Sequence, residues 1–422
     1  MLRLIPVGEF AGIHVFSGGR TGTLFMESTT ANSAAKRGHL GNLAELSIAL
    51  VSGLALALTA LFLCVVPLAG KTSGARDFVV YWATGQQLVH HANPYDRDAM
   101  MRIERSAGLV PGYGALFMRN PPWALPLALP LGFVGLRIGG FVWSLILLAC
   151  LLGSVRMLWT MYGRPDNQLH WLGYSFAPAL LCLLMGQTSL FALLGFVLFL
   201  RLHQTRPFLA GMSLWLCALK PHLFLLFGVV LLVWILVSRA YKLLAGAFVA
   251  MAASSGAVYL IDPMAWTQYT QMMRTTGIEK EFIPCLSIVL RLWINPQALW
   301  LQYLPPVLGC VWALAYYWPR RVAWDWMKQG GLLMVVSIFL APYCWLFDQA
   351  LAVPALVQGA LVTRSRSLLV FLALASVVVE IELIGGVSIL SVFYLWTAPA
   401  WLAWYLLASG SAGESRDAQL SR

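Results

Sequence analysis

Long apolar segments separated by short polar turns dominate the sequence from residue 44 onward. A helix needs about 20 apolar residues to cross the hydrocarbon core of a bilayer. The segments that approach this length are 44–69, 139–161, 168–185, 189–201, 207–219, 222–238, 243–261, 298–318, 329–346, 349–362, 368–384 and 387–408. The pattern predicts an all-α integral membrane protein, a polytopic helix bundle with about 10–12 transmembrane segments.

Three of these segments are too short to span a bilayer comfortably, namely 189–201, 207–219 and 349–362. Three arrangements remain open for them: a tilted crossing, burial within the bundle, or a half-crossing.

Basic residues in the short turns predict the orientation, because Lys and Arg near the ends of spans favour the cytoplasmic side. With the N-terminus inside, every basic turn lies in the cytoplasm. These turns contain Arg164; Arg201 and Arg206; Arg239 and Lys242; Arg320, Arg321 and Lys328; and Arg364 and Arg366. Both termini are then cytoplasmic, and two long outer loops remain, at about 70–120 and 262–297, which we expect to carry short helices.

This topology gives a simple domain organisation. Residues 1–43 are expected to be a poorly ordered cytoplasmic tail, residues 44–408 a single transmembrane domain, and residues 409–422 a cytoplasmic C-terminal tail. Within the second outer loop, the apolar stretch 282–293 with its single Arg291 has the character of an amphipathic helix lying along the membrane interface.

Composition supports a membrane protein and excludes several other classes. Hydrophobic residues make up 60% of the chain and charged residues only 11%, whereas about a quarter of a soluble domain is charged. The net charge of +11 resides in the short turns, so we read it as topology and expect no nucleic-acid partner. The seven cysteines contain no CxxC pair, which argues against a disulfide framework or a zinc site, and no metal site is predicted.

Polar residues that interrupt the apolar pattern are candidates for function, because ionisable groups near or within a bilayer are costly. Asp77 follows the first span, where its carboxylate could accept a proton from a hydroxyl; position alone favours the alternative, a helix N-cap. Gln187 lies in the break Gly186-Gln187-Thr188, which is either a tight outer turn or a place where a polar side chain points into a cavity.

Two further interruptions fall on the same outer face. Lys220, Pro221 and His222 interrupt an apolar run, and Pro221 ends or kinks the helix. Lys220 either snorkels to the interface or forms, with His222, a corner suited to binding phosphate. Asp348 closes the segment 341–348 and is either a structural cap or a partner for Lys220 or an arginine.

Several of these segments resemble the sequence pattern of glycosyltransferase family 87, in the order in which the family has them. The first, DFVVYWATGQQLVHHANPYD (77–96), contains Asp77 and Tyr81. The others are NPPWALPLALPL (120–131), GQTSLFALLGFVLFL (186–200), AGMSLWLCALKPHLFLLF (210–227) and LAPYCWLFDQALAVPAL (340–356). The last departs from the family, with Ala341 where Ser is common and Cys344-Trp345 where a His often appears.

The resemblance implies a GT-C architecture and an inverting hexosyltransferase. The implied donor is a polyprenyl-phosphate sugar, often mannose, used without a cofactor on the outer face of the bacterial plasma membrane, with a lipid or glycan as acceptor. In this interpretation Asp77 is the general base for the acceptor hydroxyl. The implied phosphate-binding residues are Lys220, His222 and Arg291, and the residues that orient the substrates are Tyr81, Gln187 and Asp348.

Two other classes of function fit parts of the pattern. A transporter or flippase of polar or lipid-linked solutes is also polytopic, but its site usually lies near the bilayer midplane, whereas these polar residues collect near one face. A GT-C-like oligosaccharide ligase or polymerase would share the outer-face site and would use a pyrophosphate-linked donor.

Overall fold

The computed structural model describes residues 45–65, 77–109, 116–276 and 281–420. Regular structure in these residues is entirely helical, which confirms the all-α prediction. The chain divides into two units, Met1–Ser47 and Ile48–Arg422, and all helices from residue 78 onward belong to the second. The predicted tail 1–43 lies outside the described residues.

The helices follow one another along the chain with short connections. After a first helix, Glu45–Val65, they are α2 (Phe78–Val89), α3 (Arg97–Ser106), η1 (Pro122–Ala124), α4 (Leu125–Ala128), η2 (Leu129–Phe133), α5 (Leu136–Met161), α6 (Trp171–Tyr174), α7 (Ala177–Met185), α8 (Ser189–Leu202), α9 (Pro207–Cys217), η3 (Pro221–Phe224), α10 (Leu225–Ser238), α11 (Tyr241–Ile261), α12 (Ala265–Thr276), α13 (Leu286–Ile294), α14 (Trp300–Tyr317), η5 (Trp318–Ala323), α15 (Trp326–Leu340), η6 (Leu346–Ala352), α16 (Val353–Val362), α17 (Arg366–Ile384), η7 (Val392–Trp396) and α18 (Thr397–Leu420), with η marking 3-10 helices.

Many of these helices are suited to a bilayer. Five described helices are long and apolar enough to cross it: Glu45–Val65, Leu136–Met161, Pro221–Ser238, Tyr241–Ile261 and Arg366–Ile384. Six shorter apolar helices accompany them: Pro122–Phe133, Trp171–Met185, Ser189–Leu202, Pro207–Cys217, Trp326–Leu340 and Leu346–Val362. A polytopic helical membrane protein is therefore confirmed. The two long loops that the sequence predicts on the outer side, 70–120 and 262–297, carry the short helices α2, α3, α12 and α13, as expected.

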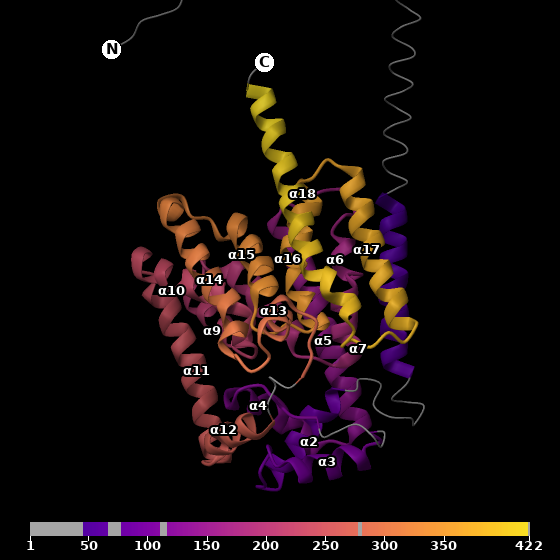
Figure 1. Ribbon diagram of the computed structural model, residues 1–422, viewed down its shortest axis with the longest axis vertical. Helices are drawn as coiled ribbons and strands as arrows, with labels where there is room; N and C mark the ends of the chain where they lie inside the picture. The colour runs from indigo at the N-terminus through magenta and orange to yellow at the C-terminus, as the bar shows by residue number, and fades with distance from the viewer. Residues whose placement is uncertain (1–44, 66–76, 110–115, 277–280, 421–422) are drawn as a thin grey trace, which may run out of the picture. The chain divides into compact units, whose positions relative to one another are not determined.

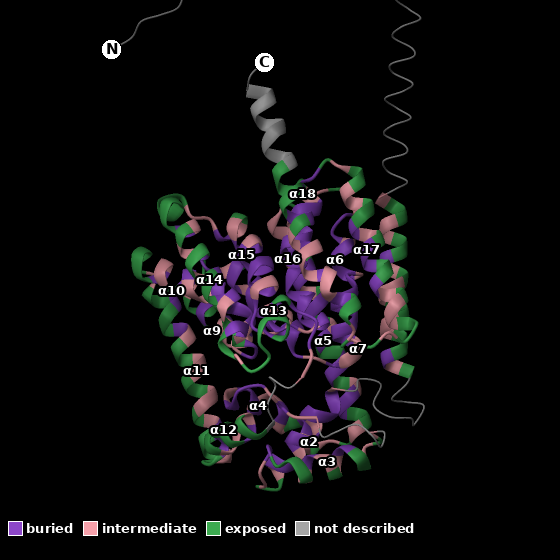
Figure 2. Ribbon diagram, in the orientation of Figure 1, coloured by how far each residue is buried: buried purple, intermediate pink, exposed green. Residues whose placement is uncertain are grey.

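The short apolar segments are accommodated largely by burial. Helix α8 packs against α5, α9 and η6, and most of its side chains are buried. Helix α16 packs against α15 and α18 and is also mostly buried (Figure 2). Helix α9 differs, because Phe208, Leu209 and Met212 remain exposed on one side while the opposite side packs on α8 and α11. Burial removes the need for α8 and α16 to present a full bilayer thickness of apolar surface to lipid.

The helices α2, α3, α4 and α12 gather at one end of this unit (Figure 1). Helix α2 is held closely against α4 and η2, since a Cβ atom on Gly85 would lie 2.3 Å from the carbonyl oxygen of Ala128 in α4 and 2.6 Å from the backbone nitrogen of Gly132 in η2. Two side chains add hydrogen bonds across this contact: Trp82 Nε1 donates to the Val134 carbonyl at 2.9 Å, and Gln86 Nε2 donates to the Gly132 carbonyl at 2.8 Å. The middle of α2 is thereby fixed in position.

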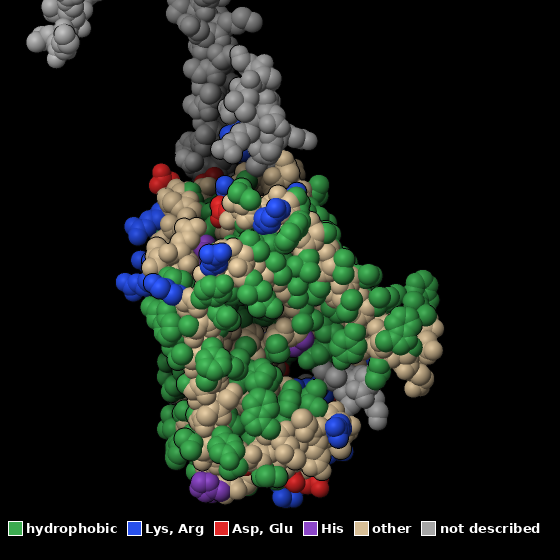
Figure 3. Space-filling view, turned by 90° about the vertical axis from the view of Figure 1, so that its left-hand side faces the viewer, with side chains coloured by type: hydrophobic (Ala, Val, Ile, Leu, Met, Phe, Trp, Pro, Cys, Tyr) green, Lys and Arg blue, Asp and Glu red, His purple; other side chains and the backbone are tan. Residues whose placement is uncertain are grey.

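Basic residues and polar interruptions lie at opposite ends of the same helices. Helix α8 runs from the Gln187 turn to Arg201, α15 runs from Lys328 toward the 341–348 segment, and α10 runs from the Lys220 turn to Arg239. Figure 3 shows Lys and Arg side chains gathered near the upper end of one face, above a broad hydrophobic region. The polar turns are therefore brought together at the other end.

Candidate active site

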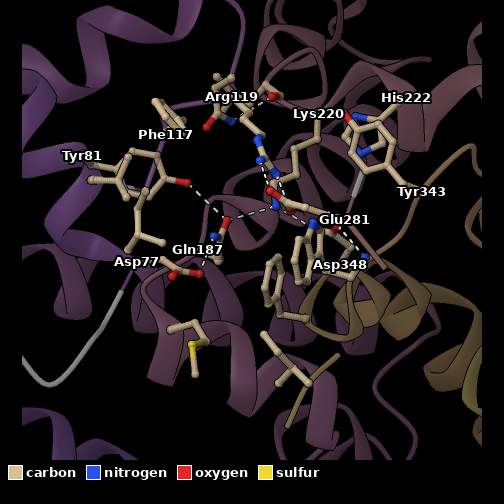
Figure 4. Close-up of a pocket in the computed structure, with 18 of the residues that line it drawn as sticks. Asp77, Tyr81, Phe117, Arg119, Gln187, Lys220, His222, Glu281, Tyr343 and Asp348 are labelled. Atoms are coloured by element: carbon tan, nitrogen blue, oxygen red, sulfur yellow. Dashed lines mark hydrogen bonds and ion pairs between the residues drawn. The ribbon is translucent and has the colours of Figure 1, made fainter. Parts of the chain in front are cut away.

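A cavity of about 440 Å³ lies where the polar turns meet (Figure 4). Its lining includes Asp77, Tyr81, Gln187, Lys220, His222 and Asp348. These residues come from segments that are far apart in the sequence, and all of them were singled out by the sequence pattern. The fold therefore assembles one polar site from the separate interruptions.

Asp77 stands immediately before α2, at the position of a helix N-cap. Its carboxylate makes no capping hydrogen bond and instead accepts from Gln187 Nε2 at 2.7 Å. The backbone N–H of Asp77 donates to the carbonyl of Met185 at 3.0 Å, which joins the start of α2 to the end of α7. The helix-cap interpretation is therefore wrong for this side chain, which instead lines the cavity.

Gln187 connects the two ends of the polar site. The turn that carries it depends on Gly186, which ends α7 in the left-handed conformation with φ of 72° and whose carbonyl accepts from the indole of Trp143 at 2.8 Å. The amide oxygen of Gln187 accepts from Lys220 Nζ at 3.1 Å and from the Tyr81 hydroxyl at 3.2 Å. Since an ammonium group can only donate, Lys220 fixes which way the amide points, and the amide N–H groups face Asp77.

The hydroxyl of Tyr81 supports the same arrangement. Burial raises the pKa of Tyr81 far above its ordinary value, so the phenol stays protonated and donates to Gln187. The ring stacks on Trp143 with centroids 5.2 Å apart, which holds the hydroxyl in the cavity wall.

Lys220 and Asp348 form a buried ion pair. Nζ of Lys220 lies 2.6 Å from Oδ1 of Asp348, and the two side chains are only 9% and 1% exposed. Asp348 also accepts from the Ser189 hydroxyl at 2.6 Å and, as a cap of η6, from the backbone N–H of Trp345 at 3.1 Å. Both interpretations of Asp348 are therefore confirmed, and its observed contacts position Lys220.

His222 faces the cavity beside this pair. Its ring stacks on that of Tyr343 with centroids 3.9 Å apart. Its buried Nε2 has no hydrogen-bond partner among the described residues. A buried ring nitrogen is costly to leave unpaired, so this atom is well suited to a hydrogen bond with a ligand.

The cavity also contains residues that the sequence pattern did not single out. Arg119 and Glu281 form an ion pair on its wall, and Tyr343, Trp345 and Phe347 supply aromatic surface. A weak signal existed for the first of these, since Arg119 directly precedes the Asn-Pro-Pro segment at residue 120. Nothing in the sequence pattern distinguishes Glu281 from the other acidic residues of the outer loops.

The profile of glycosyltransferase family 87 matches residues 117–371, more than half of the chain. The chain belongs to glycosyltransferase family 87. The matched region contains Gln187, Lys220, His222 and Asp348, whereas Asp77 and Tyr81 precede it. No curated protein and no solved structure gives a significant match. The cavity of this family 87 glycosyltransferase is accordingly its candidate active site.

Arg291 is the one predicted site residue that the cavity of this glycosyltransferase does not include. It lies in α13 with 2% of its surface exposed, and Nη1 donates to the carbonyl of Pro296 at 3.3 Å. The structure therefore does not bring Arg291 to the phosphate-binding corner. The sequence pattern identifies an arginine in the second long loop, but the direction of its side chain on α13 depends on tertiary packing.

A buried carboxyl group outside the cavity gives a pH-dependent prediction. Glu104 in α3 is fully buried and accepts from the backbone N–H of Leu116, a residue that lines the cavity, at 3.0 Å. The pKa of Glu104 is raised to about 7, chiefly by burial and to a smaller extent by the negative charge of Asp77, while the hydrogen bond from Leu116 acts in the opposite direction. Because the folded state then binds its proton more tightly than the unfolded state, the stabilisation is complete below the ordinary pKa of 4.5 and is lost as the pH rises toward 7.

We therefore expect the thermal midpoint of the wild type, relative to that of Glu104→Gln, to fall as the pH rises from 5 to 8. The amide of the variant stays neutral and can still accept from Leu116, so the difference between the two proteins reports the titration of Glu104 alone. Unfolding curves of the two purified proteins across this range measure the effect. Parallel pH profiles would show that Glu104 does not titrate in this interval.

Proposed function

We propose that this protein transfers a hexose, with mannose as the first candidate, from a polyprenyl-phosphate donor to a lipid or glycan acceptor on the outer face of the bacterial plasma membrane. The observation that carries the proposal is the hydrogen-bonded series Asp77–Gln187–Lys220–Asp348 within one cavity. It supplies a carboxylate at one side and a cation at the other, as displacement of a sugar from phosphate requires.

The proposed reaction is a single displacement with inversion in a GT-C architecture. Asp77 accepts the proton of the acceptor hydroxyl while the acceptor oxygen forms a bond to the anomeric carbon. The bond from that carbon to the phosphate oxygen breaks, and its electron pair leaves with the phosphate. Lys220 and His222 stabilise the charge on the departing phosphate, and Gln187 orients the reacting groups. The proposed chemistry uses no cofactor.

The apolar part of the cavity wall suits the lipid portion of such a donor. Met185, Leu219, Ile389 and Leu390 line it together with Phe347. A polyprenyl chain in this apolar part would extend toward the hydrophobic exterior of the helices while its phosphate stays among the polar residues. A free nucleotide sugar has no lipid chain that would bind this apolar surface.

The charge pattern supports the outer-face location. The helices that reach the cavity with one end have a basic turn at their other end. Basic turns favour the cytoplasmic side of a membrane. A polyprenyl-phosphate sugar on the outer face can react without a nucleotide. Membership in a glycosyltransferase family favours this proposal over a transporter or flippase.

A transfer assay tests the proposal. The purified protein in lipid nanodiscs receives a radiolabelled polyprenyl-phosphate mannose and a lipid extract from the host membrane. We expect label to move into a new lipid or glycan product. Transfer of another sugar from the same class of lipid would correct only the choice of mannose, whereas transfer only from a pyrophosphate-linked oligosaccharide would replace the proposed donor class.

A further inference from the structure

Arg119 and Glu281 form a two-pronged ion pair on the cavity wall. Nη1 of Arg119 donates to Oε2 of Glu281 at 2.9 Å, and Nη2 contacts Oε1. Both residues line the cavity (Figure 4), and their side chains are 22% and 39% exposed. The fork of an arginine fits a carboxylate and a phosphate in the same bidentate geometry.

The backbone that carries Arg119 is anchored to the site. The neighbouring Asn120 donates through Nδ2 to the Thr188 hydroxyl at 3.2 Å and to the carbonyl of Leu219, the residue before Lys220, at 3.0 Å. Trp123 adds a hydrogen bond to the carbonyl of Ala218 at 2.8 Å. Arg119 is thus tied to the same two turns that carry Gln187 and Lys220.

The cations of the cavity are both neutralised in this structure. Among the described lining residues, the carboxylates of Asp77, Glu281 and Asp348 outnumber the cations Arg119 and Lys220. An anionic donor entering such a site meets a negative balance, so one cation has to exchange its carboxylate for the phosphate.

The two ion pairs differ in how readily they can separate. Asp348 is 1% exposed, and removing Lys220 from it would leave a carboxylate buried without its cation. Glu281 is 39% exposed, so water can solvate its carboxylate once it leaves Arg119. The pair that can open at low cost is therefore Arg119–Glu281.

We infer that Glu281 occupies the place of the donor phosphate on Arg119, and that the phosphate displaces it when the donor binds. The inference rests on the proposed function, which it deepens by adding Arg119 as a phosphate ligand and Glu281 as an internal competitor. Lys220 keeps Asp348 and contributes to the phosphate only the third N–H of its ammonium group, which none of the described residues accepts.

We expect substitutions of the two partners of this ion pair to change the affinity for a prenyl phosphate in opposite directions. Glu281→Gln removes the competitor and tightens binding of a prenyl phosphate by about tenfold. Arg119→Gln weakens binding on the order of 10- to 100-fold, because charge-assisted hydrogen bonds to the phosphate are lost. In the double variant the gain from Glu281→Gln disappears, because the arginine that it would release is absent.

Direct binding of radiolabelled geranylgeranyl monophosphate to the protein in nanodiscs measures these effects, with the uncharged geranylgeraniol as the matched probe. Affinity for the alcohol should stay the same in all variants. Thermal unfolding checks that the partly exposed pair is not needed for folding.

Unchanged or weaker phosphate binding by a folded Glu281→Gln variant, beside clear binding by the wild type, would overturn the inference and leave the proposed function standing. The ion pair would then be a structural clasp between the two outer loops. Absence of phosphate binding by the wild type and by every variant would overturn both.

Discussion

Asp77→Asn is expected to lower the turnover number for sugar transfer by roughly 100- to 10,000-fold, the range that general-base catalysis contributes. The amide that replaces the carboxylate can still accept from Gln187, so the hydrogen-bonded series persists while the proton acceptor is lost. Donor affinity should change little, since the phosphate contacts lie on the other side of Gln187. Single-turnover transfer and donor binding, measured on the same preparation, separate the two quantities.

Asp98→Asn provides a matched control for this substitution. Asp98 is exposed in α3, within the same outer loop, and does not line the cavity. Loss of the same charge there should leave turnover within about twofold, as for other exposed substitutions. Near-normal turnover of Asp77→Asn would remove Asp77 from the role of base, and equal losses in both variants would indicate a general effect of the loop's charge.

Lys220→Met should destabilise the protein by about 3–5 kcal/mol and abolish transfer. The substitution leaves Asp348 buried at 1% exposure without its cation, a large cost in any interior. We expect this variant to show both a lower thermal midpoint and a loss of prenyl-phosphate binding. If Lys220 only snorkelled to the interface, the variant would be close to wild type in both respects.

A second substitution separates stability from function. Adding Asp348→Asn to Lys220→Met removes the uncompensated charge and keeps an acceptor for Ser189, so most of the lost stability should return while transfer stays absent. The exposed pair Lys328–Asp325, 3.6 Å apart, is the control, because Lys328→Met there should cost less than about 1 kcal/mol. Recovery of transfer in the double variant would mean that Lys220 has no part in the reaction.

The helical pattern of the chain was predictable because it follows from local composition. Apolar runs predicted the helices, five of which are, among the described residues, long and apolar enough to cross a bilayer. The polar breaks between the runs pointed to Gln187, Lys220 and His222, which do line the cavity. Their convergence also followed from the charge pattern, since alternating spans send every second turn to the same face. Both alternatives for Gln187 hold, since the residue lies in a tight turn and its side chain points into the cavity.

The outer loops were less predictable, because their helices are placed by contacts that are distant in the sequence. Asp77 has the local signature of a helix cap, but its partner Gln187 lies in another segment. Arg291 and Arg119 are both loop arginines, and only tertiary packing determines that Arg119 faces the cavity while Arg291 turns toward Pro296. The resemblance pointed to Arg291, whereas the arginine that lines the cavity is Arg119.

The most direct test of the account is the position of the donor in the cavity. A cryo-EM structure of Asp77→Asn bound to polyprenyl-phosphate mannose keeps the donor intact. We expect the phosphate within about 3 Å of Lys220 Nζ, the sugar between this group and residue 77, and the lipid chain along Met185 and Leu390. A donor bound elsewhere, such as beside Arg291, or a cavity empty at saturating donor would contradict it.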